Sequence, residues 1–340
     1  MMRPTTKDLA KAAGVSLATV DRVLNDRPGV REDTVKIVHE MIEKIGFIRN
    51  LSAANLARSR SYRFLFLVPR TGDQFLAELI ARVAEANTTL ASDMSFAEVA
   101  QIHESDPHQI ADYLSALDPQ AVDGVAIMAP ESPQARDAKA QLRRRGIETV
   151  TLISGQTSGD EVFVGIDNHA AGATAGRLMG RFLADRQGKL MVIAETMRAR
   201  DSLERRLGFD EIINADYPQL NVLPSLETHG DPDRTERVLA QTLASHSDIC
   251  GIYLLGSEAR LPLQKVAHLR PEAKPIIIAH ERTPFTEAGL RSGQIDALIT
   301  QDPGHLVRSA VRIMRARCDH REVLASQEKI RIEILLSENL

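Results

Sequence analysis

The feature that most constrains the fold is an alternation of short apolar runs with longer amphipathic segments. The apolar runs are rich in branched aliphatic residues, which is typical of buried parallel strands. They lie at 64–68, 122–129, 147–153, 162–166, 189–194, 249–255, 275–279 and 296–300. The segments that fit helices lie at 73–91, 107–117, 132–145, 169–185, 199–215, 233–245, 258–269 and 303–317. Strand followed by helix, repeated, predicts parallel sheets with helices on both faces.

There are too many of these units for one sheet of ordinary size. Two lobes of similar construction are the economical arrangement, and they would share a cleft at the carboxyl ends of their strands. Ligands of open α/β sheets bind at those ends, so the cleft is the expected ligand site.

The first 63 residues differ from the rest of the chain in charge. They carry twelve basic and seven acidic side chains, a net of +5, whereas the remaining residues carry a net of -9. A small basic head on a larger acidic body suggests a module that binds a polyanion. The whole chain, at -4, is not a uniformly basic protein.

The basic head has the signals of three short helices. Thr5 and Asp8 have the spacing of a capping box, so a first helix should begin there, and Gly14 can adopt the positive φ that ends it. Ser16 caps a second helix. Its apolar residues at i, i+3 and i+4 spacing should face a core: Val20, Val23 and Leu24. A third amphipathic helix fits residues 32–45. Two short helices joined by a glycine turn fit a helix-turn-helix, whose second helix enters the DNA major groove.

These first sixty residues closely resemble the head of the lactose/galactose repressor (LacI/GalR) family. The matching runs are TKDLAKAAGVS from Thr6, ATV from Ala18, RVLN from Arg22, Gly46-Phe47, and NLSAANLAR from Asn50. The resemblance implies a homodimer on a pseudo-palindromic double-stranded DNA operator. It also implies paired hinge helices that wedge a leucine, by position Leu56, into the minor groove and kink the duplex.

The resemblance assigns DNA-contacting roles residue by residue. The side chains facing base edges would be Leu17, Ala18 and Arg22, with Arg22 the best candidate for a guanine. Those holding phosphates would be Thr5, Ser16, Thr19 and Asn25. The remaining candidates are Asp21 on the second helix and Asn50, Ala53 and Leu56 in the hinge. Asp21 departs from the family's usual serine, and its carboxylate should repel phosphate unless it accepts from a cytosine amine or pairs with Arg22.

The family also implies the body, which resembles a periplasmic sugar-binding protein. The predicted fold is therefore an all-α helix-turn-helix head plus an α/β two-lobed periplasmic-binding-protein-like effector domain. The expected divisions are a DNA-binding domain at 1–49, a hinge at 50–62 and an effector-binding and dimerisation domain at 63–340. Lobe 1 would span about 63–166 and 303–325, and lobe 2 about 167–300 and 326–340.

The candidates for the effector site are polar or aromatic residues that follow the predicted strands. They are Arg70, Asp73, Phe75, Glu131, Asp167, Arg205, Ser257, Glu258, His280, Glu281 and Gln301. Arg205 and Gln301 match the family's ligand positions best. Phe75 is the best platform for stacking, because the chain has no Trp and 4% aromatic residues. A sugar, a polyol, an acidic sugar or an amine-bearing ligand all stay open.

Other features limit the function classes. No apolar run approaches the roughly 18 to 20 residues that cross a bilayer, and the start of the chain lacks an export signal, so we expect a cytoplasmic protein. The two cysteines, Cys250 and Cys318, are too few and too far apart for a disulfide framework. We expect no metal and no cofactor, and no leucine heptad tail follows residues 330–336, so a dimer is the simplest assembly.

The sequence thus predicts a DNA-binding transcriptional regulator, acting as a repressor, that is controlled by a small carbohydrate-like effector. Two alternatives are a transport-type solute-binding protein and an enzyme on a two-lobed α/β scaffold. The basic head argues against the first. For the second, the sequence offers no nucleophile, metal or cofactor signature.

Overall fold

The structure is a computed structural model of the whole chain. It describes residues 4–24, 27–47, 61–70, 74–103, 106–155, 161–272 and 274–340. The chain divides into two compact units, a head of Met1–Ser61 and a body of Tyr62–Leu340. Asn25 and the hinge positions Asn50, Ala53 and Leu56 lie outside the described residues, as does Asp73.

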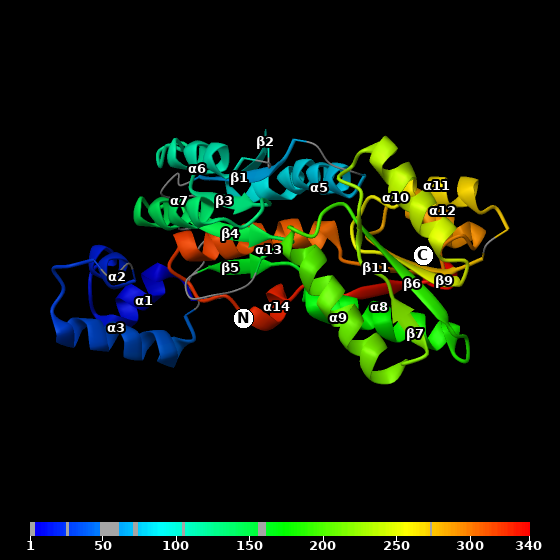
Figure 1. Cartoon of the computed structure of the whole chain (residues 1–340). Coiled ribbons are helices and arrows are strands. Elements are labelled where there is room, and N and C mark those ends of the chain that lie inside the picture. Colours follow the sequence, from blue (N-terminus) through cyan, green and yellow to red (C-terminus); the bar gives the residue numbers. More distant parts are fainter. Residues whose placement is uncertain are drawn as a thin grey trace. The chain divides into compact units, whose positions relative to one another are not determined.

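The head contains three helices around a small core (Figure 1). They are α1 (Thr6–Ala13), α2 (Leu17–Val23) and α3 (Glu32–Ile45). The predicted capping signals are confirmed, because Thr5 and Asp8 form a capping box, Gly14 ends α1 at a φ of 65°, and Ser16 caps α2. The fully buried side chains Leu9, Val20 and Val38 join the three helices.

The first lobe of the body is a parallel five-stranded sheet in the order β2-β1-β3-β4-β5. Its strands are β1 (Tyr62–Pro69), β2 (Ser95–Ile102), β3 (Gly124–Ile127), β4 (Glu148–Leu152) and β5 (Val162–Val164). One face is covered by α6 (Pro107–Ser115) and α7 (Pro133–Arg144). The other is covered by α5 (Gln74–Leu90) and by α13 (Pro303–Cys318), which returns from the far end of the chain (Figure 1).

The second lobe is a seven-stranded sheet in the order β12-β11-β10-β9-β6-β7, with β8 also paired to β6. Its strands are β6 (Gly188–Ala194), β7 (Leu220–Val222), β8 (Leu226–Glu227), β9 (Ile249–Leu254), β10 (Ile276–His280), β11 (Ala297–Thr300) and β12 (Glu333–Leu335). The last strand, β12, runs antiparallel to β11. One face packs on α8 (Asn168–Leu183) and α9 (Arg200–Asp216). The other packs on α10 (Pro232–Ser245), α11 (Arg260–Leu269) and α12 (Pro284–Ser292).

All the strands and helices predicted for the body are present, as are the three helices of the head, and the two-lobed α/β fold is confirmed. The predicted hinge helix lies outside the described residues. The sequence did not predict β2, β7, β8, β12, α12 or the short helix α14 (Ala325–Glu328). Strand β2 lies at the edge of its sheet, where one face stays largely exposed and carries Phe96 and Glu98, so it lacks the continuous apolar run of a central strand.

Helices α8 and α9 cross at unusually short range. A Cβ atom on Gly172 of α8 would lie 1.9 Å from the carbonyl oxygen of Arg205 in α9. One on Gly208 of α9 would lie 2.0 Å from the carbonyl oxygen of His169 in α8. Only glycine permits this approach, which fixes the position of the Arg205 backbone against α8. Within the described residues, no helix is both long and apolar enough for a membrane span.

Candidate functional site

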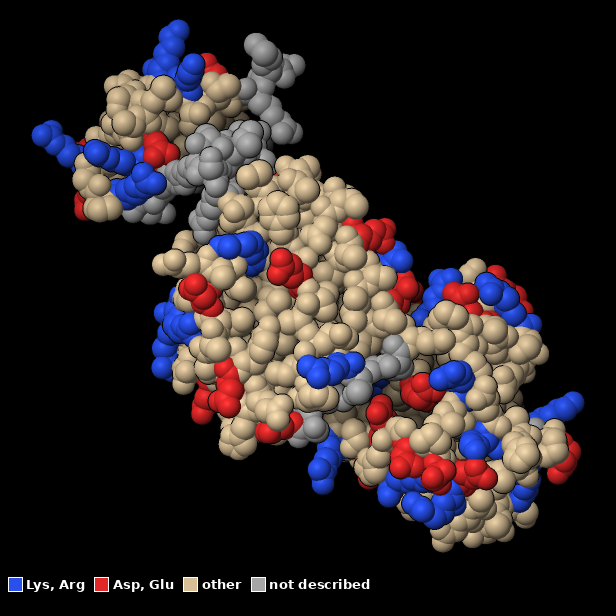
Figure 2. Space-filling view, turned by 90° about the horizontal axis from the view of Figure 1, so that it is seen from above, with Lys and Arg blue, Asp and Glu red and all other residues tan. Residues whose placement is uncertain are grey.

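The second helix of the head, α2, has one exposed face and one buried face. Val20 and Val23 are buried, whereas Leu17, Ala18, Asp21 and Arg22 are exposed, as predicted. Figure 2 shows basic side chains on the small unit that carries these helices. This face has the composition of a groove-reading surface, with one guanidinium, one carboxylate and two apolar groups.

The hydroxyl groups predicted to hold phosphates also cap the helices. Ser16 Oγ accepts from the backbone N–H of Thr19 at 3.1 Å and lies 2.9 Å from Thr19 Oγ1. The backbone N–H of Thr5 donates to Asp8 Oδ2 at 2.8 Å. Hydrogen bonds from the backbone and hydroxyl of Thr5 lower the pKa of Asp8. The caps fix the orientation of the hydroxyl groups beside the first turn of each helix.

An exposed ion pair flanks the polar face of α2. Arg27 Nη1 lies 3.4 Å from Asp21 Oδ2, and the two side chains are 56% and 51% exposed. Arg27 follows α2 in the chain, so this pair links α2 to the loop after it.

The second lobe holds a fully buried polar cluster centred on Arg205, which is 2% exposed. Its guanidinium donates to Asn168 Oδ1 at 2.9 Å through Nε, and to the carbonyl oxygen of Leu255 at 2.8 Å through Nη1. Through Nη2 it donates to Glu281 Oε1 at 3.2 Å. Helices α8 and α9 and the ends of β9 and β10 therefore converge on one guanidinium.

The carboxylate of Glu281 completes this cluster. It accepts from Gln301 Nε2 at 3.1 Å and from Thr300 Oγ1 at 3.3 Å. Burial raises the pKa of Glu281 against the opposing effect of the Arg205 charge. Glu281 adopts a φ of 65°, a left-handed conformation that is uncommon outside glycine and that clusters at functional sites. Among the predicted site residues, the structure brings Arg205, Glu281 and Gln301 together.

A second buried pair lies in the same lobe. Tyr253 Oη and His280 Nε2 are 2.7 Å apart, and both side chains are fully buried. Burial, and then the charge of Arg205, lower the pKa of His280 well below its ordinary value, so the ring is neutral near pH 7. Burial raises the pKa of Tyr253. His280 Nδ1 has no hydrogen-bond partner among the described residues.

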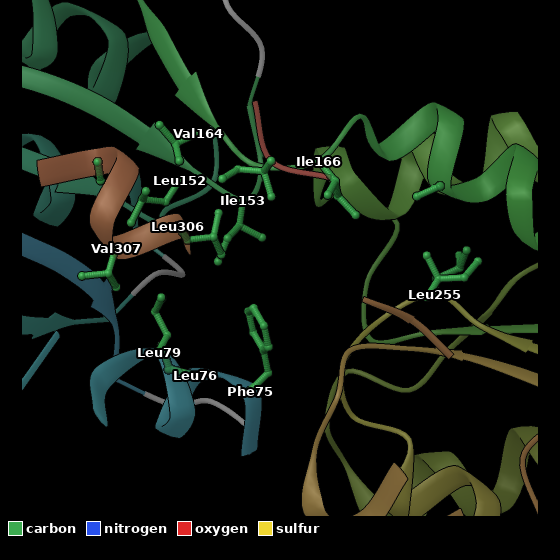
Figure 3. Close-up of a cluster of buried hydrophobic side chains, with 14 of the residues drawn as sticks. Phe75, Leu76, Leu79, Leu152, Ile153, Val164, Ile166, Leu255, Leu306 and Val307 are labelled. Atoms are coloured by element: carbon green, nitrogen blue, oxygen red, sulfur yellow. The ribbon is translucent and has the colours of Figure 1, made fainter. Parts of the chain in front are cut away.

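The cluster is tied to the first lobe by polar and apolar contacts. Gln301 Oε1 accepts from the backbone N–H of Ile166 at 3.4 Å, and Asn168 Nδ2 donates to the carbonyl oxygen of Ile153 at 3.1 Å. Phe75 is 3% exposed and belongs to the same apolar cluster as Ile153, Ile166 and Leu255 (Figure 3). The carboxyl ends of both sheets therefore meet around Arg205 and Phe75.

Two further contacts bridge the lobes near the start of α9. Arg200 Nη1 lies 3.2 Å from Glu131 Oε2, and Ser154 Oγ accepts from the backbone N–H of Asp201 at 3.4 Å. Glu131 also pairs with Arg136 of its own lobe at 3.3 Å. Glu131, a predicted site residue, thus lies where the lobes touch.

The other predicted residues have local partners. Arg70 Nη1 lies 3.1 Å from His103 Nε2, and Asp167 accepts from the backbone N–H of Ala170 at the start of α8. Glu258, which follows Ser257 in the chain, accepts from the backbone N–H of Leu261 at the start of α11.

Sequence reasoning missed Asn168, Thr300 and Tyr253. Asn168 ends the run Val164–Asn168, and Thr300 precedes Gln301, so both were adjacent to named candidates. Tyr253 lies inside a buried strand, where nothing in the pattern separates a core residue from a polar partner. Across the described residues, no three His, Cys, Asp or Glu side chains are grouped so that they could hold a metal ion.

Comparison with known proteins divides the chain at the same point as the structure. The family model of bacterial regulatory proteins, lacI family, matches residues 5–50, and that of the periplasmic binding protein domain matches residues 64–322. The transcriptional regulator RegA of Clostridium saccharobutylicum is 32% identical over 168 residues, 49% of this chain and 48% of that one. The ribose operon repressor of Halalkalibacterium halodurans is 25% identical over 277 residues, 80% of this chain and 77% of that one.

The chain spans about half the length of several curated relatives that it matches. Among solved structures, a solute binding protein of Burkholderia graminis in complex with D-arabinose has a TM-score of 0.70 at 21% identity. That match covers 82% of this chain and 96% of the other. This likeness shows the two-lobed fold of the body.

Proposed function

The body of the chain belongs to the family of periplasmic binding protein domains, and the residues before it match the lacI family of bacterial regulatory proteins; we propose from this that the protein is a transcriptional repressor. It binds a specific DNA operator through the head and a small carbohydrate-like effector between the lobes of the body. The relatives named above are regulators, and their names support this function over catalysis or solute transport.

The observation that carries the effector site is the buried cluster of Arg205, Glu281 and Gln301. Its guanidinium and carboxylate offer hydrogen-bond donors and acceptors for hydroxyl groups, which is the chemistry that a polyhydroxylated ligand needs. The D-arabinose complex of the Burkholderia protein supports a carbohydrate on this fold.

The head acts on DNA as a homodimer at a pseudo-palindromic operator in the cytoplasm. Leu17, Ala18 and Arg22 face the bases, Thr5, Ser16 and Thr19 hold phosphates, and the hinge with Leu56 enters the minor groove. The exposed face of α2 and the capped hydroxyl groups support this assignment.

The effector controls DNA binding by differential affinity for two arrangements of the lobes. A ligand that prefers lobes in contact stabilises contacts such as Gln301–Ile166 and so changes the spacing of the two heads in the dimer. Whether it releases or strengthens operator binding depends on which arrangement the DNA-bound dimer prefers.

Operator gel shifts with the purified full chain and its own promoter region test this function. Candidate pentoses, hexoses, polyols and hexuronic acids are added one at a time. We expect retardation of the DNA and a change in affinity with one carbohydrate class. Failure to retard the DNA together with turnover of a carbohydrate would instead support an enzyme.

Two variants on α9 test whether the effector binds at the Arg205 cluster. Arg205→Lys removes the forked guanidinium, so the carbohydrate response should disappear while operator binding remains. Arg206→Lys is the matched control, because Arg206 pairs with Asp210 at 2.8 Å and bonds Ser225, away from Glu281. An unchanged response in the Arg205 variant would place the effector elsewhere.

A further inference from the structure

Asp21 stands in the middle of the face that α2 turns outward. At about 100° per residue, it projects between Leu17 and Ala18, about 40° from the first and about 60° from the second. The three are exposed, and Val20 and Val23 on the opposite side are buried. Asp21 therefore occupies a base-facing direction if Leu17 and Ala18 do.

We propose that Asp21 reads a cytosine in each operator half-site, with its carboxylate held by Arg27. This inference rests on the proposed DNA-binding function and adds a base contact to it. An ionised carboxylate has only acceptors, so in the major groove it can bond only to a base that offers a donor.

Cytosine is the base that fits this requirement best. It presents its N4 amine, whereas guanine and thymine present the acceptor atoms O6, N7 and O4. Adenine also carries an amine, but its acceptor N7 lies beside it and repels the second carboxylate oxygen. Arg22, about 100° further round α2, bonds the O6 and N7 of a guanine, so the two side chains together select C·G pairs.

The ion pair with Arg27 makes a carboxylate tolerable beside DNA. Arg27 Nη1 lies 3.4 Å from Asp21 Oδ2, so the pair carries no net charge into the field of the phosphates. An unpaired carboxylate facing the backbone would weaken binding to every sequence equally. A paired one facing the bases penalises only the sequences that lack a donor.

Selection from random duplexes with the full-length protein tests the proposal. The wild type should enrich a cytosine at one position of each half-site. Fluorescence anisotropy should show that replacing it by thymine weakens binding roughly five- to 150-fold. Asp21→Ala should lose the preference at that position alone, and Asp21→Asn should move it toward adenine, because an amide can bond adenine N6 and N7 together.

The control variant and the contrary outcomes separate this inference from the function on which it rests. Arg27→Gln should keep the cytosine preference but weaken binding to all sequences, since the carboxylate is then uncompensated. The contrary outcome is that Asp21→Ala binds every sequence more tightly and keeps the preference for cytosine. Its affinity would then also fall more steeply with salt, by about one phosphate contact. That result would mean that Asp21 faces phosphate and that the inference is wrong. A wild-type protein that enriches no sequence overturns the proposed function itself. Circular dichroism melting of each variant checks that the head is folded.

Discussion

Two arginine–carboxylate pairs in this molecule have the same chemistry and opposite surroundings. Arg27 and Asp21 in the head are 56% and 51% exposed, whereas Arg205 and Glu281 in the body are 2% and 3% exposed. Water screens the first pair, so it contributes about 1 kcal/mol or less to stability. The second pair is enclosed, so each charge depends on the other. The comparison suggests that the polar side chains of the exposed pair in the head can reorient, whereas those of the buried pair in the body are held in one arrangement.

The largest effect should come from removing one member of the buried pair. Glu281→Ala leaves the Arg205 charge buried without its carboxylate, and we expect the free energy of unfolding of the body to fall by about 3–5 kcal/mol. Asp21→Ala in the exposed pair should change that of the head by about 1 kcal/mol or less. Urea unfolding followed by circular dichroism measures both. Equal costs for the two variants would contradict the comparison.

The crossing of α8 and α9 should be nearly as sensitive. Gly172→Ala places a Cβ 1.9 Å from the carbonyl oxygen of Arg205, so the helices must separate. Overpacking of this kind costs about 1–3 kcal/mol, and it should also move Arg205 away from Glu281.

Gly256→Ala is the matched control for that variant. A Cβ there would meet no atom within 4 Å, and Gly256 is not among the positive-φ glycines. The thermal unfolding temperature and the carbohydrate response of operator binding should both change in the Gly172 variant. Neither should change in the Gly256 control. A Gly172 variant with normal stability and response would show that the crossing tolerates separation.

The buried His280 predicts a pH dependence of the body. Burial depresses its pKa well below the ordinary 6.5, so below about pH 6.5 the unfolded chain binds a proton that the folded body refuses. The stability that the neutral ring supplies is therefore present above that pH and is lost as pH falls, at a slope that cannot exceed about 1.4 kcal/mol per pH unit.

His280→Gln should flatten that dependence. Glutamine can still hydrogen-bond to the Tyr253 hydroxyl but does not titrate, so unfolding measured from pH 7 to pH 5 should vary less in the variant. His108→Gln is the control, because His108 lies exposed on α6, and this variant should keep the wild-type difference in stability between pH 7 and pH 5. The same slope in the His280 variant and the wild type would assign the dependence to other groups.

The sequence predicted the parts of the fold that depend on local chemistry. Capping residues such as Thr5, Ser16 and Gly14 specify helix ends from neighbours three or four residues away, so the three helices of the head could be predicted. The central strands could be predicted because both of their faces are buried. Strand β2 could not, since the polar residues Ser95, Glu98 and Gln101 interrupt its apolar run.

The candidate site was predictable only in part. Arg205, Glu281 and Gln301 lie far apart in the chain, and the strand-end rule predicted each position without predicting that they bond to one another. Phe75 was predicted as a surface for stacking, but the structure places it in the apolar cluster shared with Leu255, because α5 packs where the lobes meet. Long-range pairing of this kind depends on the sheet order, which no local pattern contains.

The smallest effect should come from the exposed bridge between the lobes. Arg200 and Glu131 are 35% and 31% exposed, so Arg200→Gln should change the stability of the body by less than about 1 kcal/mol. Arg200 also bonds Glu204 of its own helix at 2.8 Å, but only its bond to Glu131 requires the lobes to touch. The variant should therefore favour separated lobes, and effector dissociation should become severalfold faster. Arg136→Gln is the control, since Arg136 bonds Glu131 within one lobe and is indifferent to their separation. Stopped-flow dissociation at low and high salt measures both variants. The difference between them should shrink as salt screens the bridge, and a difference that salt leaves unchanged would mean that Arg200 acts through packing instead of charge.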